Sequence, residues 1–261
     1  MNIVIITGAS SGIGLEFAVK MDPGFHNIDE FWLVARREDK LKETAKLLNH
    51  RTRLFPMDIT DSAQLDILED AVIEQNAAVR ILINCAGFGL MGDFSDQDME
   101  AALGMIRLNC MALTELTHRM LPYMRRNSRI IQLASGAAFL PQPDFAVYAA
   151  SKSYVLSFSR ALRRELKPFG IWVTSVCPGP VDTPFFDIAE KGGSTLAIKK
   201  LVMVSAEKVV EQALRDSYFR REMSVCSLPI KGMHLISKIL PHRVILDVLN
   251  LMKSGQARLE E

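Results

Sequence analysis

The chain has 261 residues, a length that suits one α/β domain with a substantial buried core. Its 31 basic and 30 acidic side chains leave a formal charge of +1, which gives no electrostatic reason to expect nucleic acid or an anionic membrane as a partner. The cysteines are widely separated and form no CxxC pair, so we expect neither a zinc site, nor any other metal site, nor a disulfide framework; they are Cys85, Cys110, Cys177 and Cys226.

Short aliphatic and β-branched runs alternate with longer segments of helical periodicity. This alternation predicts an α/β fold with a single domain over residues 1–261, namely a Rossmann-type doubly wound parallel sheet with helices on both faces. The predicted strands are Asn2 to Thr7, Phe31 to Ala35, Arg53 to Met57, Val79 to Ile83, Arg129 to Ala134 and Ile171 to Val176. The predicted helices are Gly12 to Met21, Glu38 to Leu48, Ser62 to Gln75, Asp96 to Arg126, Ala146 to Lys167 and Ala206 to Arg221.

The N-terminal segment MNIVIITGAS lacks the basic region of a signal peptide, and its apolar run is short enough for a buried strand. A cytoplasmic protein is therefore expected. This strand runs directly into Thr7-Gly8-Ala9-Ser10-Ser11-Gly12-Ile13-Gly14. Glycines at a strand-to-helix junction let the backbone approach a pyrophosphate, while the next helix presents its N-terminus to the charge. Such a turn can also exist without a ligand, but its position favours dinucleotide binding.

The GxxxGxG spacing of this turn resembles the TGxxxGIG coenzyme signature of the classical short-chain dehydrogenase/reductase family. Further matches follow in the order of that family: Asp58-Ile59, Asn84-Cys85-Ala86-Gly87, Asn109, Ser135, Tyr148-Ala149-Ala150-Ser151-Lys152 and Pro178-Gly179-Pro180-Val181-Asp182-Thr183. One departure is Cys85, which stands where the family often has a second asparagine. The resemblance implies an enzyme that interconverts alcohols and carbonyl compounds with a nicotinamide coenzyme.

The resemblance also implies which residues bind that coenzyme. The implied contacts are to adenine from Asp58 and Ile59, to the nicotinamide ribose from Asn84, Ala86, Gly87 and Lys152, and to the carboxamide from Pro178, Gly179, Val181 and Thr183. Asp58 taken alone would also fit a helix cap before Thr60 and Asp61.

Coenzyme preference is predicted from the end of the second strand, where NAD-binding folds carry an acidic residue for the ribose 2′-hydroxyl. This chain has Arg36 and Arg37 there. Guanidinium groups form charge-assisted bonds to a 2′-phosphate, so we expect NADP(H). A solvated pair of basic residues that opens a helix is the alternative.

The predicted catalytic residues are Asn109, Ser135, Tyr148 and Lys152. Tyr148 would act as the general acid/base, and Lys152, four residues later on the same helical face, would lower its pKa. Ser135 would hold the substrate oxygen. By the resemblance, Asn109 would support a water chain from the lysine to solvent; its alternative is a polar side chain that satisfies a helix irregularity.

A hydrophobic ketone or alcohol is the expected substrate, such as a hydroxysteroid, a bile acid or a 3-oxoacyl compound. The positions expected beside the nicotinamide are largely apolar, and we find no arginine clamp among them: they are Phe88, Leu90, Met91, Ala137 to Leu140, Phe145, Phe185 and Phe186. Residues 183–205 would form a substrate loop. The apolar segment 228–252 contains charges that argue against a transmembrane span, and it could be a lid, an interface or a peripheral membrane contact.

Two alternatives remain at this point. A non-catalytic NADP(H)-binding regulator would keep the fold and the glycine motif, although the intact Ser135, Tyr148 and Lys152 argue against it. An epimerase or dehydratase of the extended relatives would require a longer chain and different glycine spacing. By analogy with the family, a homodimer or homotetramer is expected through the helices near 96–126 and 146–167.

Overall fold

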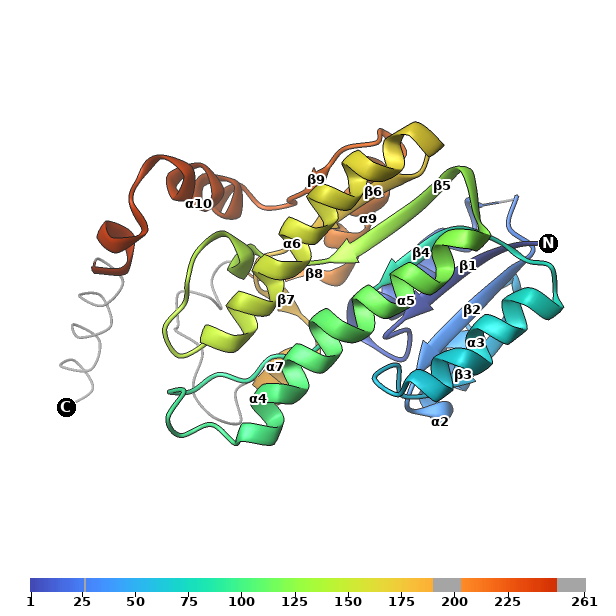
Figure 1. Ribbon diagram of the computed structural model, residues 1–261, viewed down its shortest axis with the longest axis horizontal. Helices are drawn as coiled ribbons and strands as arrows, with labels where there is room; N and C mark the ends of the chain where they lie inside the picture. Colours follow the sequence, from blue (N-terminus) through green and yellow to red (C-terminus); the bar gives the residue numbers. More distant parts are fainter. Residues whose placement is uncertain (26, 190–202, 248–261) are drawn as a thin grey trace.

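Runs of β-branched and aliphatic residues form a seven-stranded parallel sheet (Figure 1). The computed structural model describes residues 1–25, 27–189 and 203–247. The strand order is β3-β2-β1-β4-β5-β6-β9, with bounds β1 Asn2–Thr7, β2 Glu30–Ala35, β3 Arg51–Pro56, β4 Ala78–Asn84, β5 Met124–Leu133, β6 Trp172–Val176 and β9 Met223–Ser224. Because the chain proceeds outward from β1 in one direction and from β4 in the other, the crevice between these two strands is the topological switch point at which such sheets bind ligands.

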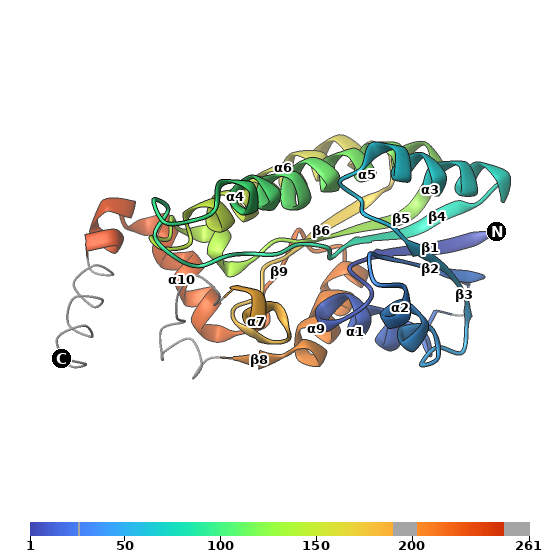
Figure 2. The ribbon, with the colours of Figure 1, turned by 90° about the horizontal axis from the view of Figure 1, so that it is seen from below.

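Helices cover both faces of the sheet (Figure 2), so its inner strands β1, β2, β4 and β6 are buried on both sides. On one face, Ile3 and Ile5 of β1 pack in a cluster with Leu65 of α3 and Leu116 of α5. On the other face, Val4 and Ile6 pack with residues of α1, α2 and α9. The alternation along β1 therefore builds two separate cores.

The helices have the following bounds: α1 Gly12–Met21, α2 Glu38–Ala45, α3 Ser62–Glu74, α4 Met99–Ile106, α5 Leu113–Met120, α6 Ala146–Leu166, α7 Phe185–Ala189, α9 Ala206–Tyr218 and α10 Leu228–Ile239. Short 3₁₀ turns lie at Leu121–Tyr123, Gly136–Phe139 and Lys167–Phe169, and a two-stranded sheet joins β7 Val181–Asp182 to β8 Val204–Ser205. None of the helices in the described ranges is long and apolar enough to cross a membrane.

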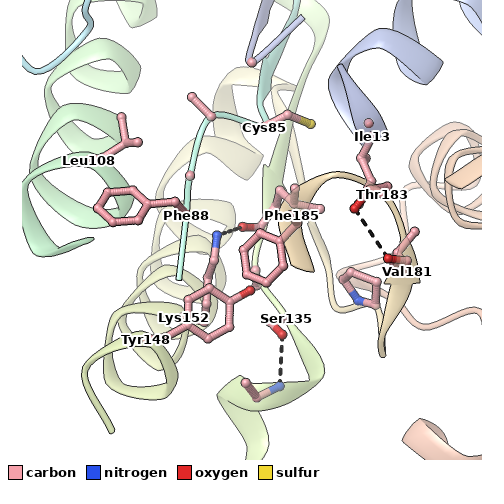
Figure 3. Close-up of a pocket in the computed structure, with 18 of the residues that line it drawn as sticks. Ile13, Cys85, Phe88, Leu108, Ser135, Tyr148, Lys152, Val181, Thr183 and Phe185 are labelled. Carbon is pink, nitrogen blue, oxygen red and sulfur yellow. Dashed lines mark hydrogen bonds between the residues drawn. The ribbon is translucent and has the colours of Figure 1, made fainter. Parts of the chain in front are cut away.

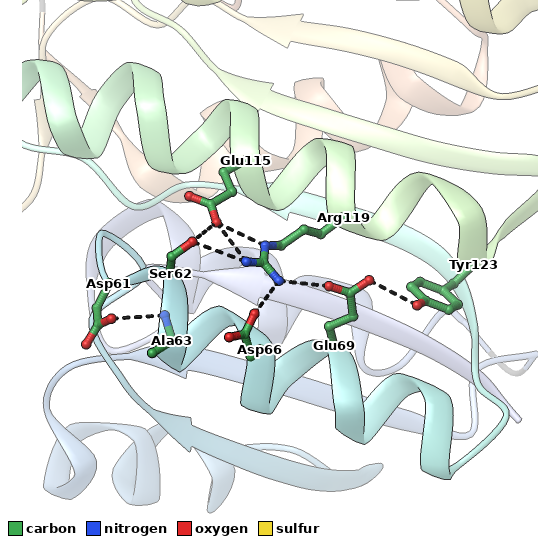
Figure 4. Close-up of polar contacts among 8 residues, drawn as sticks. All are labelled: Asp61, Ser62, Ala63, Asp66, Glu69, Glu115, Arg119 and Tyr123. Atoms are coloured by element: carbon green, nitrogen blue, oxygen red, sulfur yellow. Dashed lines mark hydrogen bonds and ion pairs between the residues drawn. The ribbon is translucent and has the colours of Figure 1, made fainter.

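Arg119 of α5 joins α5 to α3 through several carboxylates (Figure 4). Its guanidinium lies 2.7 Å from Asp66, 2.9 Å from Glu69 and 3.0 Å from Glu115. Tyr123 donates to Glu69 over 3.0 Å. A network of this kind holds two helices in register more effectively than one exposed ion pair. This network fixes α5, and the π-helical turn that directly precedes α5 leads toward the candidate site.

The structure confirms the predicted doubly wound sheet and corrects two details. The predicted helix 96–126 ends at Tyr123 and contains a π-helical turn at Arg107–Ala112. The fifth strand begins at Met124 and not at Arg129. Met124 pairs with Val79 of β4, and the residues between Met124 and Arg129 bulge out of the ladder with β4. Ser128 holds this bulge, since its hydroxyl accepts from the Arg125 N–H at 3.0 Å and donates to the Val79 carbonyl at 2.9 Å.

Candidate active site

A cavity of about 1390 Å³ opens at the carboxyl ends of the strands, at the switch point between β1 and β4. Its walls come from the segments that follow the first six strands of the sheet and from α10. The strand-following segments include Gly8–Gly14, Arg36–Arg37, Asp58–Thr60, Cys85–Phe88, Ser135–Ala137 and Pro178–Val181. Residues far apart in the sequence therefore meet at one edge of the sheet. The side chains and backbone groups that each segment presents to the cavity determine which ligand it can bind.

The turn after β1 has the geometry that a pyrophosphate needs. Gly8 and Gly12 adopt φ values of +67° and +55°, which disfavour residues with side chains. At Gly14 a Cβ atom would lie 2.3 Å from the Gly8 carbonyl oxygen, so the helix can pack against the turn only without it. Ser11, the N-cap of α1, makes no side-chain capping bond, which leaves the N-terminal amides of the helix available to an anion. The residues present thus fit the diphosphate of a dinucleotide.

Thr7 ties this turn to β4. Its hydroxyl accepts hydrogen bonds from the N–H groups of Cys85 and Ala86, at 3.0 and 3.1 Å. The two neighbouring strand ends on either side of the switch point are therefore held together by one side chain. Cys85, Ala86 and Gly87 form the adjacent wall of the cavity.

The two arginines after β2, Arg36 and Arg37, line the same cavity. Arg37 donates to the hydroxyls of Ser10 and Ser11 over 3.2 Å each. The Arg36 guanidinium is largely exposed and lies 3.9 Å from the Asp58 carboxylate. Asp58 also accepts from the Thr60 N–H at 2.9 Å, while Asp61 caps α3, so the capping role once open to Asp58 belongs to Asp61. Ile59 is buried against the cavity.

Helix α6 presents Tyr148 and Lys152 on one face toward the space beside Ser135 (Figure 3). Both side chains are buried, with exposed fractions of 7% and 3%. The Ser135 hydroxyl lies beside Tyr148 and accepts from the Ala137 N–H at 3.1 Å. The Lys152 ammonium donates to the Leu133 carbonyl over 2.7 Å and lies 5.7 Å from the centroid of the Tyr148 ring.

Burial sets the pKa values of these two groups. It raises the pKa of Tyr148 to about 12, an effect that the neighbouring Ser135 hydroxyl partly offsets. It lowers the pKa of Lys152 to about 8. The sequence led us to expect that Lys152 lowers the pKa of Tyr148. This expectation is wrong, because loss of water around the buried phenol raises the pKa and outweighs the opposing effect of Ser135.

Asn109 lies in the π-helical turn and is completely buried behind the cavity wall. Its side-chain oxygen accepts from the Phe88 N–H at 3.1 Å, and its nitrogen donates to the Phe88 carbonyl at 2.9 Å and to the Ser151 hydroxyl at 3.0 Å. A Cβ on Gly87 would lie 2.8 Å from this side-chain oxygen and 3.3 Å from the Lys152 nitrogen. Asn109 therefore joins the loop after β4 to α6, close to Lys152. The irregularity in the helix that carries Asn109 is the π-helical turn itself.

Asn84 does not lie where the sequence led us to expect. Its side-chain nitrogen donates to Thr117 and Gln132, both at 3.0 Å, and the residue is buried beneath the cavity wall. The adjacent wall is formed by the three residues that follow it. The polar end of β4 points into the core because Thr117 of α5 and Gln132 of β5 offer partners there.

The segment after β6 closes the side of the cavity opposite the loop after β4. The Pro178 carbonyl accepts from the Gly136 N–H at 2.7 Å, and Thr183 donates to the Val181 carbonyl at 3.4 Å. Gly179 packs against Ile230 of α10, where a Cβ would lie 2.8 Å from the isoleucine. All four residues predicted here, Pro178, Gly179, Val181 and Thr183, line the cavity.

Gly89 carried little signal in the sequence, whereas α10 lies in the apolar segment 228–252, for which a lid was one of the predicted roles. Gly89 lies against the Tyr148 ring, and a Cβ there would come within 2.6 Å of it. The apolar residues of α10 line the cavity opposite the glycine turn; they are Ile230, Met233 and Ile236. Much of the substrate loop predicted over 183–205, namely residues 190–202, lies outside the described residues, as does the part of the C-terminal segment beyond residue 247.

Comparison with known proteins gives consistent matches. A family profile described as short chain dehydrogenase matches residues 2–192. Sulfoacetaldehyde reductase 2 of Chromohalobacter salexigens is 30% identical over 263 residues, which cover 98% of this chain and 96% of that protein.

Solved structures share the architecture. A short-chain dehydrogenase from Sphingobium yanoikuyae in complex with NADPH superposes with a TM-score of 0.77 at 28% identity, covering 99% of this chain and 96% of that one. A short chain dehydrogenase/reductase from Burkholderia phymatum in complex with NAD gives a TM-score of 0.79 at 23% identity, over 90% of this chain and 92% of that one. Together with the profile match and the glycine turn, these likenesses lead to one conclusion: the chain belongs to the short-chain dehydrogenase/reductase family of oxidoreductases, which use nicotinamide coenzymes.

Proposed function

We propose that this protein is an NADP(H)-dependent oxidoreductase that interconverts a secondary alcohol and a ketone on a hydrophobic substrate. The observation that carries the proposal is the convergence of Ser135, Tyr148 and Lys152 on one side of a cavity that also contains the glycine turn. The bound coenzyme would supply or accept the hydride. The remaining task is to move a proton to or from the substrate oxygen, and the chain itself has groups for it.

Tyr148 is the group we assign to that proton transfer. With a pKa of about 12, its phenol keeps its proton at neutral pH and can donate it to a carbonyl oxygen during reduction. Ser135, which lies beside Tyr148 in the cavity, is placed to hold the same substrate oxygen and to stabilise negative charge that develops on it. Lys152 would favour the phenolate that remains, because its ammonium lies near the ring in a site with little water.

Asn109 acts in this proposal as a positioning residue. It contacts the loop after β4 and Ser151 of α6, and a Cβ at Gly87 would meet both its side-chain oxygen and the Lys152 ammonium. The water chain suggested by the family resemblance remains part of the proposal.

The preference for NADP(H) rests on Arg36 and Arg37. Both guanidinium groups line the cavity, and Arg37 already contacts the serine hydroxyls of the glycine turn. A 2′-phosphate would find two cations there, with Asp58 lying 3.9 Å from Arg36. This arrangement supports NADP(H) over NAD(H).

A hydrophobic substrate is favoured by the walls around Tyr148. Phe145 stacks on the Tyr148 ring with centroids 4.2 Å apart, and Phe185 lies 5.5 Å away. Among the described cationic residues that line the cavity, Arg107 lies outside the coenzyme and catalytic groups, and it is paired with Glu100. An anionic substrate would have to compete with that carboxylate, whereas an apolar substrate would gain from the aromatic walls.

The proposal is tested by fluorescence titration with NADPH and NADH, followed by a 340 nm assay of NADPH oxidation across ketones from steroids to oxoacyl thioesters. We expect tighter binding of NADPH and turnover of apolar ketones. Tight binding without turnover of any ketone would instead support a non-catalytic regulator, and equal affinity for both coenzymes would remove the role of the arginines.

We also propose that the protein forms a homodimer or homotetramer through α4, α5 and α6. Exposed apolar side chains on this part of the surface support the proposal, with Met99, Met111 and Tyr154 exposed by 63%, 62% and 43%. Light scattering after size exclusion would show a mass of two or four chains.

A further inference from the structure

A second hollow of about 380 Å³ lies beside the active-site cavity, behind the segment Leu140–Pro143. Leu140, Gln142 and Pro143 line both spaces, so the two hollows share this segment as a common edge. The floor of the second hollow is the first turns of α6, where Ala146, Ala149 and Ala150 are too small to fill it. The hollow therefore adjoins the active site on the same helix that carries Tyr148.

One helical turn after α10, at residues 242–247, covers both hollows. Ile245 of this turn lines the active-site cavity, while His242 and Leu246 line the second hollow. The two spaces thus have a common roof as well as a common edge. The second hollow is partly open to solvent, since Ala146 and His242 of its lining are exposed.

The lining of the second hollow is mostly apolar, and its polar residues are Gln142, Ser153 and His242. The proton of the Ser153 hydroxyl already has partners within the chain, since it is donated to the Ala138 and Ala149 carbonyls at 3.0 and 2.9 Å. The alanines offer only methyl groups. The main cavity of about 1390 Å³ would hold both the coenzyme and the reacting end of the substrate, so a compact substrate bound beside Tyr148 would leave the second hollow empty.

We propose that the substrate is an elongated carbonyl or alcohol compound whose flexible hydrocarbon chain runs from Tyr148 past Gln142 and Pro143 into the second hollow. This inference rests on the proposed oxidoreductase function and narrows its substrate class. A rigid fused-ring ketone fills the main cavity but cannot bend around the shared edge. A single alkyl chain can bend there, and its methylene groups leave water as they pass beneath Ile245 and Leu246.

The test is kcat/KM for NADPH-dependent reduction of 2-alkanones from 2-butanone to 2-dodecanone, with cyclohexanone and a steroid ketone as compact comparisons. Burial of each added methylene raises kcat/KM about fourfold until the second hollow is filled. A maximum at short chain length, or a steroid ketone that exceeds every alkanone, overturns the inference and leaves the oxidoreductase function intact. Absence of turnover for every ketone overturns both.

Two variants test whether the hydrocarbon chain of the substrate occupies the second hollow. Ala146→Phe places a ring in the second hollow from an exposed position at the start of α6, and we expect it to lower the ratio of kcat/KM for 2-dodecanone to that for 2-butanone at least tenfold. Ala161→Phe makes the same change at an exposed position farther along α6, and the ratio should stay at the parent value.

Leu246→Ala removes part of the roof and should lower the same ratio. Melting temperatures of all three variants show whether they fold. An unchanged ratio in folded Ala146→Phe and Leu246→Ala proteins would show that the chain does not occupy the second hollow.

Discussion

Replacement of the two arginines after β2 by Asp and Ser (Arg36→Asp with Arg37→Ser) should convert the coenzyme preference from NADPH toward NADH. Arg37 sits 3.2 Å from each of two hydroxyls on the glycine turn, and Arg36 is 75% exposed. A hydrogen bond to a charged group contributes about 1.5–3 kcal/mol, and solvent screening at an exposed site reduces that value. For the pair we expect a loss of about 2–3 kcal/mol, which weakens NADPH binding about 30- to 150-fold.

The assay is a fluorescence titration with both coenzymes at fixed ionic strength, because screening affects these contacts. NADH affinity should change by less than about threefold or improve, since it carries no 2′-phosphate. Arg164→Asp, an exposed arginine near the end of α6, controls for altered net charge and should leave both affinities unchanged. Equal losses for NADPH and NADH in the double variant would refute the reasoning and indicate that the arginines only shape the turn.

Two further predictions concern titrating groups. The kcat/KM for ketone reduction should fall as pH rises through about 8, where Lys152 loses its proton while Tyr148, with a pKa of about 12, keeps its own; a flat profile to pH 10 would contradict this. Asp22 is buried and accepts bonds from Asn49 and His50, which outweigh burial and lower its pKa to about 2. Asp22→Asn should cost about 2 kcal/mol of unfolding free energy at pH 7, and urea titrations should show this deficit shrinking as pH falls from about 4 to 2; a constant deficit would contradict it.

The inner strands β1, β2, β4 and β6 were predictable from the sequence because almost all of their residues are buried, so each appears as an apolar run between turns. The edge strand β3 is largely half-buried or exposed and carries a weaker apolar pattern. β9 was not predicted, since two residues carry no periodicity. The π-helical turn at Arg107–Ala112 was also missed, because one additional residue per turn changes the apolar pattern too little to be noticed. The start of β5 at Met124 depends on a bulge that Ser128 holds by a hydrogen bond to Val79 of β4. A contact between two strands leaves no pattern in the sequence of either one.

Part of the candidate site was likewise predictable from the sequence, and part was not. The glycine turn could be found because positive φ and close packing restrict the residue type at Gly8, Gly12 and Gly14. The direction of the Asn84 side chain and the raised pKa of Tyr148 depend on neighbours and burial that only the folded chain supplies. The position of α10 over the cavity likewise depends on the packing of Ile230 against glycines of two distant segments.

The measurement that tests the central claim most directly is made on Tyr148→Phe, which keeps the ring and its packing against Phe145 but removes the proton. NADPH affinity should stay within about twofold of the parent, while kcat for a ketone that the parent reduces should fall by about 10²- to 10⁴-fold. If the variant binds NADPH and reduces the ketone at a rate close to that of the parent, Tyr148 is not the acid/base and the proposed mechanism is wrong.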